Sequence, residues 1–175
     1  MLLTNRTLPP WLPLLLLAAC EPAEADDDDH GALVAEVSSD ECASGLRWVG
    51  GDEESPRMHP GGDCIGCHAR EGEGPRYLVA GTVHDLLTEA NDCFGVEGAT
   101  VEITDADGRQ WSLPTNEAGN FFLPQSEGPV AMPFRAAVLM DGMRLEMAAP
   151  QTVGSCATCH TAEGAMGAPG RVLAP

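Results

Sequence analysis

The chain has 175 residues, enough for one ordinary domain with extensions. It carries 27 acidic residues against nine arginines and no lysine, and its formal net charge is −18. Nucleic-acid-binding proteins show a basic footprint, so this composition argues against that class of partner. A strongly acidic surface suits docking to a partner protein with a basic surface, and merely solvated charge is the alternative.

Residues 1–19 are predicted to be a lipoprotein signal peptide. A positive start at Arg6 precedes an apolar stretch that is too short to span a bilayer comfortably. The stretch ends in Leu17-Ala18-Ala19-Cys20, which resembles the lipobox of bacterial lipoproteins. That resemblance implies cleavage before Cys20 and lipidation of this residue, and several acyl chains together give stable membrane anchoring. The same resemblance implies the outer membrane, because the residue after the cysteine is Glu21 and not aspartate, and the protein would then face the periplasm or the cell surface. An ordinary cleaved signal with a coincidental cysteine is the alternative.

Residues 20–40 are predicted to be an acidic disordered tether. The segment alternates alanine with acids and contains the run Asp26-Asp27-Asp28-Asp29. Such a segment has little apolar surface to bury and much like charge to repel, so we expect no fold here.

Two later segments carry the same pattern, Cys64-Ile65-Gly66-Cys67-His68 and Cys156-Ala157-Thr158-Cys159-His160. Both are C-x-x-C-H, the attachment signature of c-type haem. Two thiols at this spacing add to the two vinyl groups of one porphyrin edge, and the adjacent imidazole reaches the iron. Chance predicts on the order of 0.01 such motifs in a chain of this composition. The sequence therefore predicts two covalent c-type haems, attached through Cys64, Cys67, Cys156 and Cys159, with His68 and His160 as proximal iron ligands.

A zinc site is the alternative, because two C-x-x-C knuckles also make a zinc ribbon. Export argues against zinc, since free thiols fare poorly outside the cytoplasm. A ribbon built from four cysteines also has no need of the histidine that follows each motif.

Both haem-binding segments are expected to be rich in loops. The first spans residues 41–76, where glycine and proline are dense around Met58-His59-Pro60-Gly61-Gly62. The second spans residues 150–175 and shows no periodicity after its motif. We expect each segment to wrap its cofactor with few regular elements.

Residues 77–149 read instead as strands. Residues 99–104 alternate apolar and polar side chains with a period of two, as a half-buried strand does. Asp141-Gly142 suits a two-residue type I′ turn between two further strands. The expected strands lie at residues 77–84, 99–104, 109–113, 120–123, 134–140 and 143–148. The fold class predicted is mainly β, a small antiparallel β-sandwich flanked by loop-rich c-type haem-binding segments.

Three stretches within this region carry a resemblance to a known module. They are Gly81-Thr82-Val83, Gly95-Val96-Glu97-Gly98-Ala99-Thr100-Val101 and Thr115-Asn116-Glu117-Ala118-Gly119-Asn120-Phe121. They resemble the carboxypeptidase regulatory-like, or transthyretin-like, β-sandwich. The resemblance implies a scaffold or adhesion module without chemistry of its own.

The remaining cysteines and histidines have predicted roles. Cys42 and Cys93 are left after the motifs and Cys20 are assigned, and in an exported protein we expect them to form a disulfide. Two free buried thiols are the alternative. His59 and His84 are the candidates for the two distal iron positions, which would make both haems bis-histidine. The rival distal ligands are methionines, whose thioether ligation raises the reduction potential; they are Met58, Met132, Met140, Met143, Met147 and Met166.

The whole chain thus resembles small exported dihaem c-type cytochromes with a β-sandwich insert. The resemblance implies a membrane-anchored electron carrier rather than an enzyme. Two alternatives remain: a haem enzyme, such as a peroxidase or a small-molecule reductase, and an adhesion or assembly subunit that uses the sandwich. Carbon monoxide binding by the reduced protein would favour the enzyme, because it requires an open axial position.

Overall fold

The computed structural model describes residues 41–50 and 54–175. The predicted signal peptide (1–19), the predicted lipidation site Cys20 and the predicted tether (20–40) lie outside the described residues. None of the described helices is long and apolar enough to cross a membrane.

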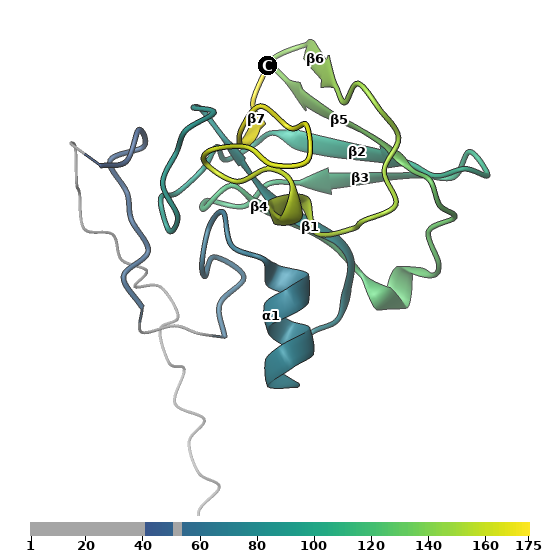
Figure 1. Cartoon of the computed structure of the whole chain (residues 1–175), viewed down its shortest axis with the longest axis horizontal. Helices are drawn as coiled ribbons and strands as arrows, with labels where there is room; N and C mark the ends of the chain where they lie inside the picture. Colours follow the sequence, from purple (N-terminus) through teal and green to yellow (C-terminus); the bar gives the residue numbers. More distant parts are fainter. Residues whose placement is uncertain (1–40, 51–53) are drawn as a thin grey trace, which may run out of the picture.

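Two β-sheets pack face to face (Figure 1). The first, in the order β4-β1-β7, consists of β1 (Tyr77–His84), β4 (Asn120–Pro124) and β7 (Val172–Leu173). The second, in the order β3-β2-β5-β6, consists of β2 (Thr100–Thr104), β3 (Gln110–Pro114), β5 (Arg135–Met140) and β6 (Met143–Glu146). The predicted mainly β fold is confirmed, and it is a small sandwich.

The alternating pattern of each strand explains the core. In β2, Val101 and Ile103 are buried while the residues between them are partly exposed. Phe121 and Leu123, on β4 of the first sheet, belong to the same core cluster, as does Phe134, which directly precedes β5. Each buried aliphatic or aromatic side chain contributes about 1.5–3 kcal/mol relative to exposure. Asp141 and Gly142 both have positive φ, as the predicted type I′ turn between β5 and β6 requires.

The first motif lies on a helix, α1 (Cys64–Glu71), so the prediction of a loop here is wrong. The Asp63 carboxylate accepts the Gly66 N–H at 2.9 Å and caps the first turn. Gly72, in the left-handed conformation, ends the helix and donates its N–H to the His68 carbonyl. The sequence-based prediction of a loop followed from the many glycines and prolines before residue 63. The signal for the helix lies instead in its two capping residues, Asp63 and Gly72.

The C-terminal segment belongs to the sandwich rather than following it. Its strand β7 pairs in parallel with β1, and its 3₁₀ turn η2 (Cys156–Thr158) holds the second motif. The segment lies directly on β1, and this contact requires a glycine at position 154 of the segment. A Cβ on Gly154 would stand 1.9 Å from the carbonyl oxygen of Leu78 on β1. A Cβ on Gly81 would likewise stand 2.7 Å from the Cys156 Cβ. Two glycines therefore let the second motif contact the sheet. A second 3₁₀ turn, η1 (Gln125–Glu127), follows β4.

Candidate functional site

The histidines of both C-x-x-C-H motifs are held in the same way. The Nδ1–H of His68 donates to the Pro75 carbonyl oxygen at 2.8 Å. The Nδ1–H of His160 donates to the Gly170 carbonyl oxygen, also at 2.8 Å. A carbonyl oxygen only accepts, so each bond fixes the proton on Nδ1 and leaves Nε2 as a free lone-pair donor. This is the outer hydrogen bond that metal-ligating histidines make, and both residues fit the predicted role of proximal ligand.

The two motifs lie next to each other although about half the chain separates them in sequence. The residues that precede their first cysteines are hydrogen-bonded, with Ser155 Oγ donating to Asp63 Oδ1 at 2.6 Å. Asp63 thus caps α1 and binds the second motif with the same carboxylate oxygen. Cofactors attached at these cysteines would therefore be close neighbours.

The first cysteine of each motif, Cys64 or Cys156, has a raised pKa. Burial raises the pKa of Cys156 to about 12, and the nearby Cys64 raises it further. Burial is also the main cause of a raised pKa at Cys64. Redox-active C-x-x-C motifs instead lower a thiol pKa to form a reactive thiolate. The burial of these thiols therefore speaks against disulfide-exchange chemistry.

A large apolar cavity lies beside the second motif. Its volume is about 640 Å³, and Cys156, Cys159 and His160 line it. Most of its other lining residues are aliphatic or aromatic and come from both sheets, including Val101, Phe121, Val138 and Leu173. Cofactor sites are typically mostly apolar cavities of about 300–1,000 Å³. The residues of the second site therefore fit a haem.

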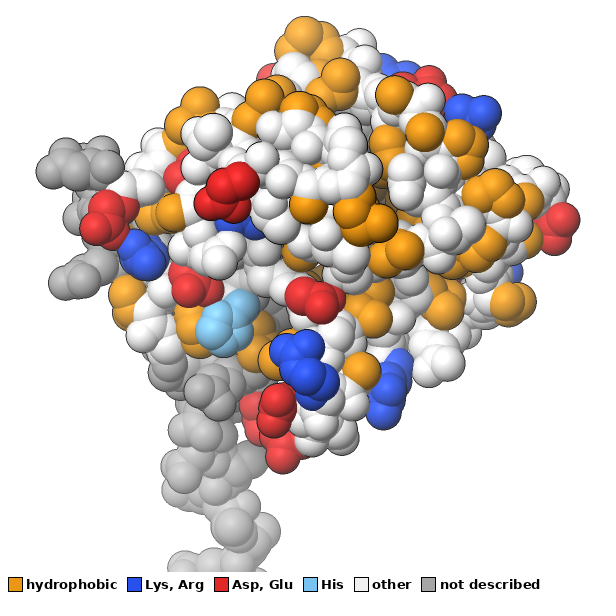
Figure 2. All heavy atoms as spheres, in the orientation of Figure 1, with side chains coloured by type: hydrophobic (Ala, Val, Ile, Leu, Met, Phe, Trp, Pro, Cys, Tyr) orange, Lys and Arg blue, Asp and Glu red, His pale blue; other side chains and the backbone are white. Residues whose placement is uncertain are grey.

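The surroundings of the first motif are more open. All residues of α1 are partly or fully exposed. The His68 ring lies 5.4 Å from the ring of Tyr77, which in turn lies 4.9 Å from Phe122. Figure 2 shows Arg and acidic side chains together around the end of the molecule where α1 lies, with hydrophobic atoms scattered over the opposite end. A cofactor attached at Cys64 and Cys67 would thus lie against these rings near a charged surface.

The two histidines predicted as distal ligands do not line the cavity. The Nδ1 atom of His59 pairs with Asp92 at 3.0 Å, and the side chain is 48% exposed. The His59 ring lies 3.8 Å from the Trp48 ring, between centroids, and is tilted against it by 51°. His84 is fully buried at the end of β1, and neither ring nitrogen has a hydrogen-bond partner among the described residues. Burial and then the charge of Arg171 lower the pKa of His84 to about 4. For the haem at the second motif, the structure therefore favours neither histidine.

Two methionines of the predicted rival set do line the cavity, Met147 and Met166. Met166 is 79% exposed and lies in the loop after His160. Its Sδ atom is 3.8 Å from Cys159 Sγ. Met147 follows β6.

Arg171 links the second site to the rest of the fold, and sequence reasoning missed it. This cation is 3% exposed and lines the cavity beside His160. It donates to the carbonyl oxygens of Glu89 and Gly61 and to the Asn91 side chain. Burial lowers the pKa of Arg171 below its ordinary value, and the neighbouring acids oppose that shift. An isolated arginine in a glycine-rich tail gives no sequence signal for this role.

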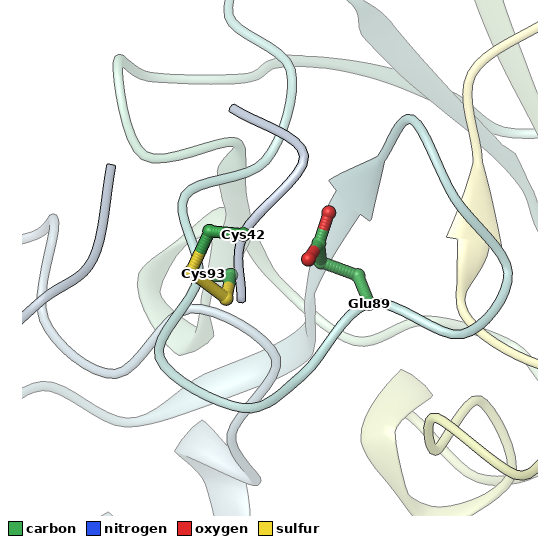
Figure 3. Close-up of side chains that lie close together, drawn as sticks. All are labelled: Cys42, Glu89 and Cys93. Atoms are coloured by element: carbon green, nitrogen blue, oxygen red, sulfur yellow. A yellow bond between two sulfur atoms is a disulfide. The ribbon is translucent and has the colours of Figure 1, made fainter. Parts of the chain in front are cut away.

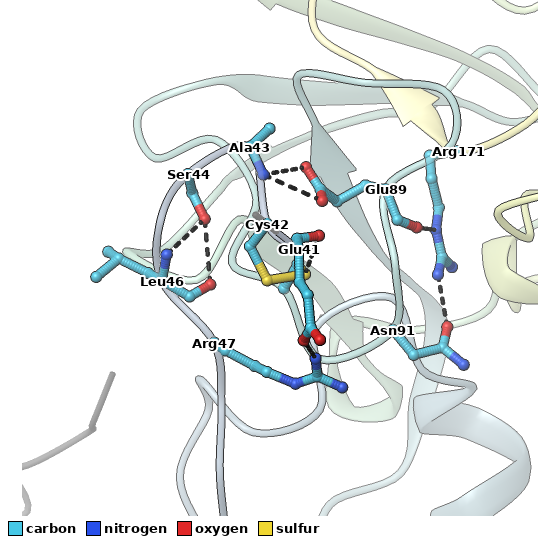
Figure 4. The surroundings of a disulfide bond; sticks show 10 residues. Glu41, Cys42, Ala43, Ser44, Leu46, Arg47, Glu89, Asn91 and Arg171 are labelled. Atoms are coloured by element: carbon cyan, nitrogen blue, oxygen red, sulfur yellow. Dashed lines mark hydrogen bonds and ion pairs between the residues drawn. A yellow bond between two sulfur atoms is a disulfide. The ribbon is translucent and has the colours of Figure 1, made fainter. Parts of the chain in front are cut away.

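The predicted Cys42–Cys93 disulfide is present (Figure 3). The backbone N–H of Ala43 donates to the buried carboxylate of Glu89, and Arg47 pairs with Glu41 beside it (Figure 4).

Cys42, Glu89 and Cys93 are the one group of potential metal ligands that converge among the described residues, and both thiols are consumed by the disulfide. The four motif cysteines do not form such a group among the described residues.

No protein-family model, curated protein or solved structure matches this chain.

Proposed function

We propose that this protein is a membrane-anchored dihaem c-type cytochrome that transfers electrons in the periplasm or at the cell surface. One observation carries the proposal: both motif histidines donate Nδ1–H to a backbone carbonyl and keep Nε2 free. A C-x-x-C-H segment that bound no metal would not require its histidine to be held with Nε2 free. The same hydrogen bond at both motifs therefore supports two iron sites. The membrane anchor rests on Cys20, which lies outside the described residues.

The chain's own residues would act in three ways. The four motif cysteines would attach the porphyrins, and His68 and His160 would ligate the irons. The apolar cavity would exclude water from one site, while α1 would leave the other site near the surface. The Asp63–Ser155 hydrogen bond would hold the two attachment points together. Each bound haem supplies one-electron chemistry, and its potential responds to ligand identity and burial.

The proposal is tested by counting haems. The pyridine haemochrome spectrum and the intact mass of the membrane-extracted protein should give two covalent haems and a lipidated N-terminus. The variants Cys64→Ser/Cys67→Ser and Cys156→Ser/Cys159→Ser should each retain one haem, and Cys42→Ser/Cys93→Ser, the matched control, should retain two. A protein that matures with zinc, or with no covalent haem, would overturn the proposal.

A haem enzyme is the second candidate, and carbon monoxide separates it from a carrier. An electron carrier has both axial positions filled, so the reduced protein should bind little carbon monoxide. Rapid and complete binding of carbon monoxide would favour a haem enzyme over an electron carrier.

A further inference from the structure

The cavity beside the second motif has two walls of different origin. His160 and both motif cysteines belong to the C-terminal segment, which lies against β1 of the first sheet. The facing wall comes from β5 and β6 of the second sheet. A cofactor held by His160 would therefore have its other face toward the β5–β6 hairpin.

The register of this hairpin shows which of its side chains share a face. Val138 pairs with Leu145, and the backbone N–H of Met147 donates to the Ala136 carbonyl at 2.9 Å. The pairing thus continues one residue past the end of β6. Because side chains alternate across a strand, Leu145 and Met147 share a face with Ala136 and Val138, and all four residues line the cavity.

A six-coordinate haem iron takes its two axial ligands from opposite faces of the porphyrin. On the wall facing His160, the other lining residues on the Met147 face are alanine, valine and leucine, which offer no donor atom. Glu146 also lines the cavity, but it belongs to the opposite face of β6, and its carboxylate lies 4.0 Å from Arg144. Met147 has a flexible side chain that ends in a thioether. The methionine thioether is a known axial ligand in c-type cytochromes. Met166 belongs to the same segment as His160 and lies beside Cys159.

From these positions we propose that Met147 is the distal ligand of the haem bound at Cys156, Cys159 and His160. The inference rests on the proposed function and makes it more specific. It replaces bis-histidine ligation at this site with histidine–methionine ligation. The buried, methionine-ligated haem is then the higher-potential member of the pair, because thioether ligation and an apolar cavity both disfavour the ferric charge.

The test uses the full-length dihaem protein and three leucine variants. Magnetic circular dichroism of the oxidised wild type should show the methionine–iron charge-transfer band. The Met147→Leu variant, which nearly conserves volume, should lose the band, bind carbon monoxide at one haem when reduced, and lower one of the two midpoint potentials. Met166→Leu and Met143→Leu should keep the wild-type spectrum. Met143 is the matched control, because it shares the Met147 face of the hairpin but does not line the cavity.

The outcomes separate this inference from the proposed function. Two covalent haems without a methionine band, or a band lost in Met166→Leu and kept in Met147→Leu, would overturn the inference and leave the electron carrier standing. Absence of covalent haem would overturn both. If Met147→Leu does not fold, Met147→His supplies a replacement ligand, and it should lose the band while remaining six-coordinate. The band should also persist in Cys64→Ser/Cys67→Ser, which retains the second haem alone.

Discussion

At the scale of single residues, His84 is the predicted distal ligand with the most unusual surroundings. A histidine at the end of a strand looked available for iron, yet it is fully buried without a hydrogen-bond partner among the described residues. Its pKa falls to about 4, first because burial penalises the charged ring and second because Arg171 is close. The folded protein therefore holds His84 neutral in the pH range where an ordinary histidine protonates, near 6.5.

This burial predicts an acid-sensitive fold. Between about pH 6.5 and pH 4 the unfolded chain protonates this histidine while the folded chain does not, so stability falls as the pH falls. Above that window His84 adds no pH dependence. From pH 7 to pH 4.5, His84 should cost the wild type roughly 2 kcal/mol of unfolding free energy, and the His84→Leu variant should be spared this loss.

Urea unfolding of both proteins at the two pH values measures the difference. His59→Asn, a change at an exposed histidine, is the control and should follow the wild type. Equal acid losses in the wild type and His84→Leu would contradict the prediction. A bis-histidine spectrum that disappears in His84→Leu would restore His84 as an iron ligand.

At the scale of elements, the contact between the second motif and β1 depends on Gly154. A Cβ at this position would stand 1.9 Å from a backbone oxygen, which cannot rotate away. Gly154→Ala should therefore displace the segment from β1 and cost about 1–3 kcal/mol, the usual range for overpacking. The loss should appear as a lower urea midpoint, together with weaker retention of the second haem and normal retention of the first.

Thr152→Ala provides the control for this substitution. Thr152 is exposed and lies two residues earlier in the same segment, so its truncation should change stability by less than about 0.5 kcal/mol. A Gly154→Ala protein as stable as the wild type would show that the segment can leave β1 without cost.

Local patterns predicted the strands well and the long-range contacts poorly. Residues 99–104 alternate apolar and polar side chains, so β2 was visible in the sequence. Helix α1 was missed although Asp63 and Gly72 are good capping residues, because the segment before it is dense in glycine and proline. The parallel pairing of β7 with β1 joins residues nearly ninety positions apart, and a two-residue strand has no periodicity to detect.

In the candidate site, too, the sequence predicted some residues and only the structure shows the others. The six motif residues follow from sequence alone, because the proposed covalent attachment of haem requires their spacing. The carbonyl partners of His68 and His160 are backbone atoms and leave no trace in residue type. Met147 resembled core filler, because Met140 and Met143 lie on the same face of the β5–β6 hairpin and only the position of the cavity separates Met147 from them.

At the scale of the whole molecule, charge should govern which partners react quickly. The chain carries a formal net charge of −18, and haem propionates would add to it. A field of one sign raises the encounter rate with oppositely charged partners by about 10–1,000-fold at low salt. The effect weakens as the Debye length shrinks from about 30 Å at 0.01 M to about 8 Å at 0.15 M ionic strength.

Stopped-flow oxidation of the reduced dihaem protein by two small oxidants tests this expectation. The rate with hexaammineruthenium(III), a cation, should fall by about tenfold or more as ionic strength rises over that range. The rate with ferricyanide, an anion, should rise over the same range, because salt screens the repulsion. Opposite trends with one protein exclude a general effect of salt on the fold. Rates that fall together, or that ignore salt, would contradict electrostatic steering and remove the reason to expect a basic redox partner.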